Sequence, residues 1–289
     1  MGAVSQITPM TLIKRVWERI APLQLAEQSW DNVGPIMEAP YPNLNHRQIL
    51  LTIDLTPAVC AEALALPSLS MIISYHPPIF RGLKFLTMSD PLQASLLRLT
   101  ARGISVFSPH TSLDATPNGI NAWMVKPFVP LSTFDRPISL SPNPPESFDG
   151  AGMGRYVELQ KPLDLLQAVR IIKEHLGLSY VQLAEPTSSR PIKSLAVCAG
   201  SGGSVFKGTN ADLLITGEMS HHEVLAYANS GIAVILTNHT NNERPYLSQV
   251  LRARLQEELD KEVDDQNPLK SEKWEVLVSK ADVDPLRIV

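Results

Sequence analysis

The stretch that decides the fold is residues 49–76, ILLTIDLTPAVCAEALALPSLSMIISYH. The apolar run Ile49–Leu55 predicts a buried strand, Pro57–Leu66 predicts a helix, and Met71–Ser74 predicts a second strand. That second strand must end at the Pro77-Pro78 pair, because proline cannot continue a hydrogen-bond ladder. A strand, a helix and a strand in this order are typical of a mainly parallel sheet, so an α/β fold is expected.

The same alternation extends in both directions from this stretch. Thr8-Pro9 predicts a capped amphipathic helix, and Gly103 stands where the helix before it would end. Three more segments have helical patterns: Pro91–Arg102, Leu163–Leu176 and Pro245–Lys261. Further strands are expected at Ile104–Ser108, Tyr156–Leu159, Tyr180–Leu183, Ser194–Cys198, Asp212–Thr216, Ile232–Thr237 and Trp274–Val278.

The composition changes between Pro127 and Gly150, where prolines gather and long apolar periods are few, so a linker is expected there. A chain of 289 residues is long enough for two α/β units. We therefore expect two α/β domains with mainly parallel or mixed sheets. Residues 1–132 and 232–289 would form the main domain, and residues 133–231 the second.

Bulk composition excludes several classes of protein. Hydrophobic residues make up 44% and charged residues 19%, which is typical of a globular chain. The net charge of -4 leaves no basic excess to hold a nucleic acid. Cys60 and Cys198 lie far apart in apolar stretches, as expected of buried thiols in a reducing compartment. No run approaches the roughly 18 apolar residues of a membrane span, and no signal peptide is visible, so a cytoplasmic protein without membrane contact is expected.

Histidines gather at the ends of predicted strands. Five of the seven follow a strand or open the next helix, namely His76, His110, His221, His222 and His239. In open α/β sheets the carboxyl ends of strands form the ligand crevice, so side chains from separate strands converge there. With the carboxylates that follow two of these strands, the expected metal-binding set is His76, Asp114, His239 and Glu243.

Each member of this set also has a simpler explanation. His76 could be a buried imidazole in a rigid proline turn, and Asp114 could belong to a helix cap or an Asx turn. His239 and Glu243 share one face if a helical turn begins between them, but a capping pair would explain Glu243 equally well. Two imidazoles and two carboxylates without a thiol suit Zn²⁺, Mn²⁺ or Fe²⁺.

The segment Gly217–Glu223 and the glycine-rich loop Ala199–Ser204 also follow predicted strands. Glu218 is a candidate general base, and His221 is a second candidate for proton transfer. His221 and His222 are adjacent, so at most one of them can face an ion. The glycine-rich loop could cradle a phosphate, but it lacks a P-loop lysine, which favours a plain tight turn.

Together, six short motifs resemble the Ngg-one-interacting factor three (Nif-three) family, whose members are also described as GTP cyclohydrolase I type 2 homologues. The motifs occur in the family's order over nearly the whole chain. Several have forms that look most like the eukaryotic branch. They are SWDNVG (Ser29–Gly34), SYHPPIF (Ser74–Phe80), SPHTSLD (Ser108–Asp114), GEMSHH (Gly217–His222), NHTNNERP (Asn238–Pro245) and DPLRIV (Asp284–Val289).

The resemblance implies two α/β domains with a two-metal centre in the cleft between them, and a homo-oligomer, a hexamer or a dimer. It places the family's ligands on the same four residues, His76, Asp114, His239 and Glu243. Many relatives have two consecutive histidines where this chain has Tyr75-His76. A phenol with a pKa of about 10 is a poor ligand at neutral pH, so Tyr75 weakens the expected occupancy of the second ion.

Two functions from different classes follow from these observations. The first is a metal-dependent hydrolase of a nucleotide or a related small molecule, with GTP ring opening as the usual assignment in the family. The second is a non-catalytic interaction protein that binds a transcriptional co-regulator or another partner, for which a nuclear location would also suit. A mitochondrial location fits the sequence as well.

Overall fold

The computed structural model describes residues 8–188, 190–262 and 273–287. Two compact units are formed, each from two pieces of chain. Unit 1 comprises residues 1–113 and 247–283, and unit 2 comprises residues 114–246 and 284–289. The sequence-based domains, 1–132 with 232–289 and 133–231, stay a prediction, because compactness alone does not show which segments fold independently.

Unit 1 is built on a five-stranded sheet in the order β1-β4-β3-β2-β13. The four strands β2, β3, β4 and β13 run parallel, and β1 pairs with β4 in the antiparallel direction. The expected α/β class with mixed sheets is confirmed. The bounds are β1 Gly34–Met37, β2 Gln48–Thr52, β3 Leu69–Ser74, β4 Ser105–Ser108 and β13 Glu275–Val278.

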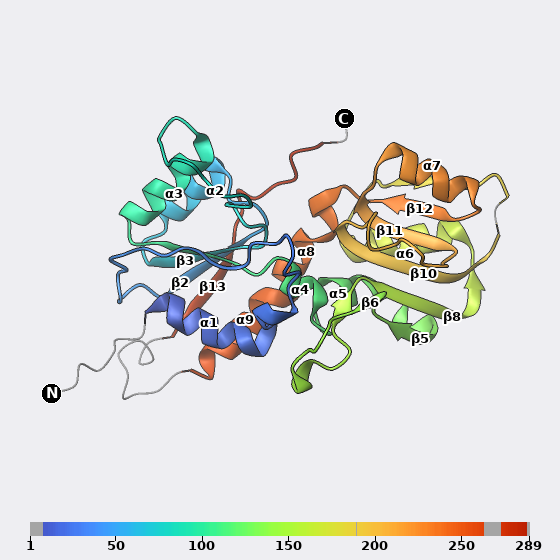
Figure 1. Ribbon diagram of the computed structural model, residues 1–289, viewed down its shortest axis with the longest axis horizontal. Helices are drawn as coiled ribbons and strands as arrows, with labels where there is room; N and C mark the ends of the chain where they lie inside the picture. The colour runs from blue at the N-terminus through green and yellow to red at the C-terminus, as the bar shows by residue number, and fades with distance from the viewer. Residues whose placement is uncertain (1–7, 189, 263–272, 288–289) are drawn as a thin grey trace. The chain divides into compact units, whose positions relative to one another are not determined.

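Helices cover both faces of this sheet (Figure 1). On one face α2 (Pro57–Ala65) and α3 (Pro91–Ala101) pack over Leu50, Ile72 and Val106. On the other face lies α1 (Pro9–Ile20), whose buried Trp17 meets Phe107 at a ring-centroid distance of 5.4 Å. Alternate residues of each strand thus enter separate apolar layers, which explains why the strands of this sheet are apolar without interruption.

The three main helices of unit 1 begin in the same way. Each has a threonine or aspartate cap followed by proline in the first helical turn, at Thr8-Pro9, Thr56-Pro57 and Asp90-Pro91. The cap oxygen accepts a hydrogen bond from a backbone N–H that has no partner within the helix, and the proline needs no such partner. Gly103 follows α3 with φ +72, as the sequence predicted. These local signals explain why the helix starts could be predicted closely.

The predicted C-terminal helix is present but is not one regular α-helix. It begins as α8 (Arg244–Tyr246), passes through a π turn, η5 (Leu247–Leu251), and continues as α9 (Arg252–Asp260). The change from unit 2 to unit 1 falls at the start of this π turn. Beyond it, α9 packs beside α1, where Arg19 forms an ion pair with Glu258 at 2.7 Å.

Unit 2 contains a six-stranded sheet in the order β5-β8-β10-β11-β12-β9. Its three central strands, β10, β11 and β12, are parallel, and the outer strands are antiparallel to their neighbours. The core on one face includes Cys198, Phe206, Leu214 and Val234. The bounds are β5 Ser132–Arg136, β8 Arg155–Leu163, β9 Gln182–Ala184, β10 Ile192–Ser201, β11 Leu213–Glu218 and β12 Ala233–Leu236.

Several short elements complete unit 2. Helix α6 (Leu165–Leu176) is held at its start by a capping box between Asp164 and Gln167, and it ends at Gly177 in the left-handed conformation. The other elements are α4 (Thr111–Ala115), which spans the boundary of the units, and α5 (Ile120–Val125), α7 (His221–Asn229), β6 (Ser139–Leu140) and β7 (Gly152–Met153).

The linker expected between Pro127 and Gly150 is wrong for part of that segment. Residues Ser132–Arg136 form β5, which pairs with β8 at the edge of the six-stranded sheet. Proline is tolerated next to an edge strand because one side of its backbone forms no ladder, so the proline content did not exclude a strand. No helix in the described residues is long and apolar enough to cross a membrane.

Candidate metal centre

The His239 turn lies at the carboxyl end of β12 in unit 2. Asn238 has φ +66 and ψ 152, a strained backbone conformation for any residue but glycine. The chain then forms a single 3-10 turn, His239–Asn242, followed by Glu243. This turn brings His239 Nε2 to 3.6 Å from Glu243 Oε1, and the Glu243 side chain is buried. An imidazole and a carboxylate four residues apart therefore face one point.

Glu218 fixes the orientation of the His239 ring. Its Oε1 atom, at the end of β11, lies 3.0 Å from His239 Nδ1. A carboxylate this close to Nδ1 favours the tautomer that has its proton on Nδ1, which leaves Nε2 to face Glu243. Metal-binding histidines typically have this arrangement: a carboxylate contacts one ring nitrogen, and the second ring nitrogen faces the metal. Glu218 itself is well exposed, so it can also reach solvent.

Gly200 leaves room for both of these side chains. A Cβ atom at this position would lie 2.6 Å from Glu243 Oε1 and 2.9 Å from His239 Nε2. Its φ of +60 also favours glycine. The glycine-rich loop predicted as a tight turn therefore has a second property, because its backbone makes the close approach that lets His239 and Glu243 meet.

A buried polar network holds this loop in place. Asn121 accepts a hydrogen bond from Ala199 N–H at 2.8 Å, and Asn242 accepts one from Gly200 N–H at 3.1 Å. The hydroxyl of Thr216 accepts from Gly202 N–H and donates to the Gly200 carbonyl. Buried backbone groups are costly unless they are paired, so these side chains fix where Gly200 lies.

Asp114 lies in the same part of unit 2. Asn121 donates to its backbone carbonyl at 3.1 Å, and the Asp114 side chain is buried. Burial raises the pKa of the nearby Cys198 thiol, and the negative charges of Asp114 and Glu243 raise it further. Cys198 therefore stays a neutral thiol, and two buried carboxylates lie near it. Concentrated negative charge of this kind favours a bound cation.

In unit 1, His76 follows β3 and is held by Asp54. The distance from His76 Nδ1 to Asp54 Oδ1 is 2.9 Å, so this imidazole is also oriented by a carboxylate. Its neighbour Tyr75 is buried, and the two rings lie 5.0 Å apart. Backbone hydrogen bonds from Tyr75 and His76 to the β2 strand end fix this turn.

His110 lies next to His76 in unit 1 and has its own buried carboxylate. Asp31 Oδ1 is 2.6 Å from His110 Nδ1, and Asp31 Oδ2 accepts hydrogen bonds from the Thr111 hydroxyl and N–H. Burial alone would raise the pKa of Asp31, but the hydrogen bond and charge of His110, with the bonds from Thr111, lower it below its usual value. The backbone of His110 has φ +31, a strained conformation for histidine.

The sequence model of the family Duf34/NIF3 (NGG1p interacting factor 3) matches residues 9–269. The chain belongs to the Duf34/NIF3 family. The predicted resemblance to the Nif-three family is thereby confirmed.

Curated NIF3 relatives cover most of the chain. Protein NIF3 homolog of Schizosaccharomyces pombe is 44% identical over 252 residues, which span 87% of this chain and 88% of the relative. NGG1-interacting factor 3 of Saccharomyces cerevisiae is 39% identical over 83% of this chain and 81% of its own length. A Bacillus cereus protein related to NIF3 has the same fold, with a TM-score of 0.79 at 18% identity over 99% of this chain and all of that chain.

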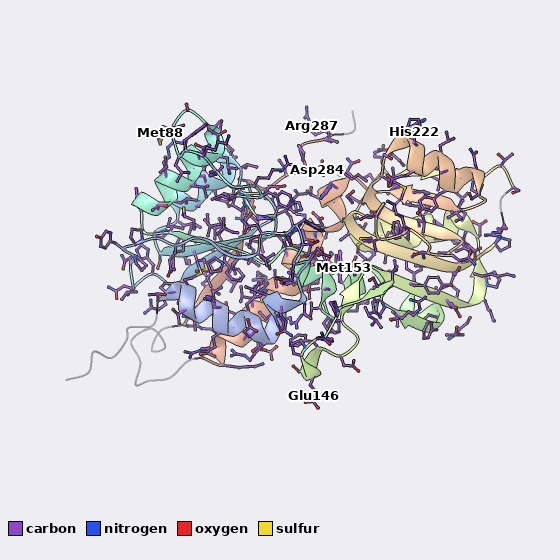
Figure 2. The ribbon with its side chains drawn as sticks, viewed as in Figure 1. Met88, Glu146, Met153, His222, Asp284 and Arg287 are labelled. Atoms are coloured by element: carbon purple, nitrogen blue, oxygen red, sulfur yellow. The ribbon has the colours of Figure 1, made fainter. Side chains whose placement is uncertain are left out.

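Some predicted site residues of this NIF3 chain lie together and one does not. Within unit 2, Asp114, Glu218, His239 and Glu243 belong to one region, whereas His221 opens the separate helix α7. His221 and His222 are both exposed and contact each other at a centroid distance of 5.4 Å; Figure 2 shows His222 on the outer side of α7. Roles in catalysis for Glu218 and His221 stay predictions.

Several residues that shape these NIF3 regions were not singled out from the sequence. Asp31 and Asp54 orient imidazoles, and Asn121, Thr216 and Asn242 hold the glycine-rich loop. Asp31 and Asn242 do lie inside family motifs, SWDNVG and NHTNNERP, which was a usable signal. Asp284 of the DPLRIV motif contacts the His239 turn, where it accepts a hydrogen bond from the Thr240 hydroxyl at 2.8 Å.

Proposed function

We propose that this NIF3 protein is a metal-dependent hydrolase of a nucleotide or a related small molecule, with His76, Asp114, His239 and Glu243 as metal ligands. Within unit 2, His239 Nε2 and Glu243 Oε1 lie 3.6 Å apart and are donors that could hold an ion. Imidazole nitrogen and carboxylate oxygen suit Zn²⁺, Mn²⁺ or Fe²⁺. A second ion, as the family resemblance implies, would need further donors, and Tyr75 offers a poor one at neutral pH.

The observation that carries this proposal is the orientation of His239 within unit 2. Glu218 holds Nδ1, and the opposite nitrogen is directed at buried Glu243 beside a backbone position that accepts no Cβ. In an apolar core, side-chain atoms would pack against the backbone at this position. At Gly200 the space beside the backbone is instead taken by the donor atoms of His239 and Glu243, as is typical of a ligand site. The donor atoms and the buried charge both fit a divalent cation.

Two of the proposed ligands lie close in sequence to the points where the chain passes between the units. The chain passes from unit 1 to unit 2 between Leu113 and Asp114, and it returns between Tyr246 and Leu247. Asp114 is therefore the first residue of unit 2, and Glu243 lies four residues before the return to unit 1.

When bound at these residues, a divalent ion would supply Lewis acidity for attack by water. The chain's own contribution is the handling of protons. Glu218 Oε1, 3.0 Å from His239 Nδ1, would hold that ring in one orientation. Because the Glu218 carboxylate is also exposed, it can take a proton from an attacking water and pass it to a leaving group.

Glu218→Gln tests this division of roles. The amide oxygen can still accept from His239 Nδ1, so the metal content per chain is expected to stay unchanged. The amide cannot take a proton, so turnover of a responsive nucleotide by the metal-loaded protein is expected to fall by about 10² to 10⁴. Metal analysis by mass spectrometry and chromatography of a nucleotide panel provide the two measurements.

Glu185→Gln, at an exposed glutamate elsewhere in unit 2, is the matched control and should change neither quantity. If wild-type protein loaded with Mn²⁺ or Zn²⁺ consumes no nucleotide in the panel, the hydrolase proposal is refuted. Retained turnover in Glu218→Gln, with turnover in the wild type, would instead remove Glu218 as the base. Loss of turnover without loss of metal would also separate hydrolysis from mere metal storage.

The second candidate function is a non-catalytic interaction protein. A specific observation favours it, because the S. cerevisiae relative is named as an NGG1-interacting factor. If this function is independent of metal, a His239→Ala/Glu243→Ala double variant should recover the same partner as wild type in a pull-down. Loss of partner binding in that variant, with its fold intact, would count against a metal-independent role. The homo-oligomer implied by the family resemblance stays a prediction.

A further inference from the structure

Two half-exposed aromatic rings in unit 1 have no role in the proposed metal centre. Trp30 and Phe80 keep 52% and 46% of their surfaces exposed, and their ring centroids lie 6.0 Å apart. Both rings contact His110 in near edge-to-face geometry, at 6.0 Å for Trp30 and 6.4 Å for Phe80. Such contacts hold aromatic rings in place while leaving their outer faces to solvent. We call this pair the Trp30–Phe80 platform.

Hydrogen bonds beside the platform fix both rings in position. Asp31, directly after Trp30, has a fully buried side chain that accepts from His110 and Thr111. Asn32 donates from its side chain to the carbonyl of Ile79, directly before Phe80. The SWDNVG motif therefore joins the two ring-bearing segments, which are distant in sequence. A preorganised platform loses little side-chain entropy when a ligand binds.

His110 presents a polar atom at the base of the platform. Asp31 accepts from its Nδ1, so Nε2 is the ring nitrogen turned away from that carboxylate. Its backbone is held at φ +31, and its N–H donates to the Tyr75 carbonyl. Strain of this kind persists where the surrounding contacts impose it, and it is frequent at functional sites. The His110 ring also lies 5.4 Å from that of His76, which places the platform next to a proposed metal ligand.

We propose that the Trp30–Phe80 platform stacks the flat heteroaromatic ring of the substrate, and that His110 Nε2 forms a hydrogen bond with a polar group on the edge of that ring. This deepens the proposed function, on which the identification of the ligand as a substrate rests. Aromatic side chains stack on any nucleobase, because every base has a π face. Arg81 and Lys84, exposed just after Phe80, add positive charge that suits a phosphorylated ligand.

Equilibrium binding of flat rings to the full-length protein tests the platform. Guanosine, adenosine and cytidine serve as probes, and ribose 5-phosphate serves as a probe without a ring. Trp30→Ala is expected to weaken binding of the preferred nucleoside by roughly 5-fold to 100-fold. Trp30→Phe should recover part of that loss, and Phe80→Ala should act in the same direction as Trp30→Ala. Binding of ribose 5-phosphate should change by less than about 2-fold.

Tyr41→Ala is the matched control, since Tyr41 is an exposed aromatic residue of the same unit with 88% of its surface accessible. It should bind every probe as wild type does. Circular dichroism establishes whether each variant is folded. If Trp30→Ala does not fold, the binding constants of Trp30→Phe and Phe80→Ala are compared with those of wild type instead. The proposal is overturned if wild type binds none of the three nucleosides, or if folded Trp30 and Phe80 variants bind them as wild type does.

The nucleoside-binding and nucleotide-turnover measurements test the platform and the hydrolase proposal separately. If metal-loaded wild type hydrolyses no nucleotide but Trp30→Ala loses nucleoside binding, the hydrolase proposal fails and the platform is supported. If nucleotide is hydrolysed and Trp30→Ala binds nucleosides normally, the platform is overturned and the hydrolase proposal remains.

Discussion

Gly200→Ala is expected to damage unit 2 more than any other small substitution in its glycine-rich loop. The added Cβ would lie 2.6 Å from Glu243 Oε1 and 2.9 Å from His239 Nε2, and the φ of +60 would strain an alanine. Crowding and strain together should lower the free energy of unfolding by about 2 to 4 kcal/mol. They should also separate His239 from Glu243 and reduce the metal content per chain. Urea denaturation followed by circular dichroism, together with metal analysis, measures both effects.

Gly208→Ala separates crowding from backbone strain. Gly208 also has a positive φ, +78, but no atom lies within 4 Å of a Cβ built there. We therefore expect Gly208→Ala to cost only the strain of about 1 kcal/mol and to leave the metal content unchanged. Equal losses of stability and metal in the two variants would show that the close approach to His239 and Glu243 is not what Gly200 provides.

The fold followed from local signals wherever those signals were strong. The start of α1 was predicted from a cap residue followed by proline, and those of α2 and α3 were predicted at Pro57 and Pro91; the structure has all three at these positions. Buried strands such as β3 and β11 were predicted from uninterrupted apolar runs. In both cases the decisive interactions lie within a few residues of one another, so the sequence alone contains them.

Features that depend on distant partners could not be predicted in this way. Ser132–Arg136 forms a strand because it pairs with β8. The proline-rich segment itself contains no pattern that indicates this pairing. The π turn Leu247–Leu251 has no local signal either, since proline and glycine are absent from it. Pairing with β8 decided the structure of the first of these segments.

The same distinction between local and distant signals applies to the residues of the candidate site. Strand ends predicted Glu218 and His239 after two neighbouring strands, and β11 and β12 do pair in parallel, so both residues lie at one edge of the sheet. The roles of Glu218, of His239, and of Asp114 and Glu243 in the site stay predictions. The side chains that orient them were missed. Asn121 reaches the loop at Ala199, 78 positions along the chain, and an isolated asparagine carries no pattern that could reveal such a contact.

His239→Ala is expected to have the largest effect on metal binding. Its Nε2 is aimed by Glu218 at the same point as buried Glu243, so removing the ring removes a direct ligand. Loss of an outer partner alone typically weakens metal affinity by about 10-fold to 100-fold, and loss of the ligand itself should exceed that. Wild-type protein prepared without chelator should therefore contain metal, and His239→Ala protein should contain almost none.

Thermal unfolding with and without chelator gives an independent measurement of the same prediction. A metal that binds only the folded chain stabilises it, so chelator should lower the unfolding temperature of wild type. It should not change that of His239→Ala, which has no bound ion to lose. His222→Ala, at an exposed histidine of α7, is the matched control and should respond to chelator as wild type does. If His239→Ala kept both its metal and its response to chelator, His239 would not be a ligand, and its contact with Glu218 would be structural.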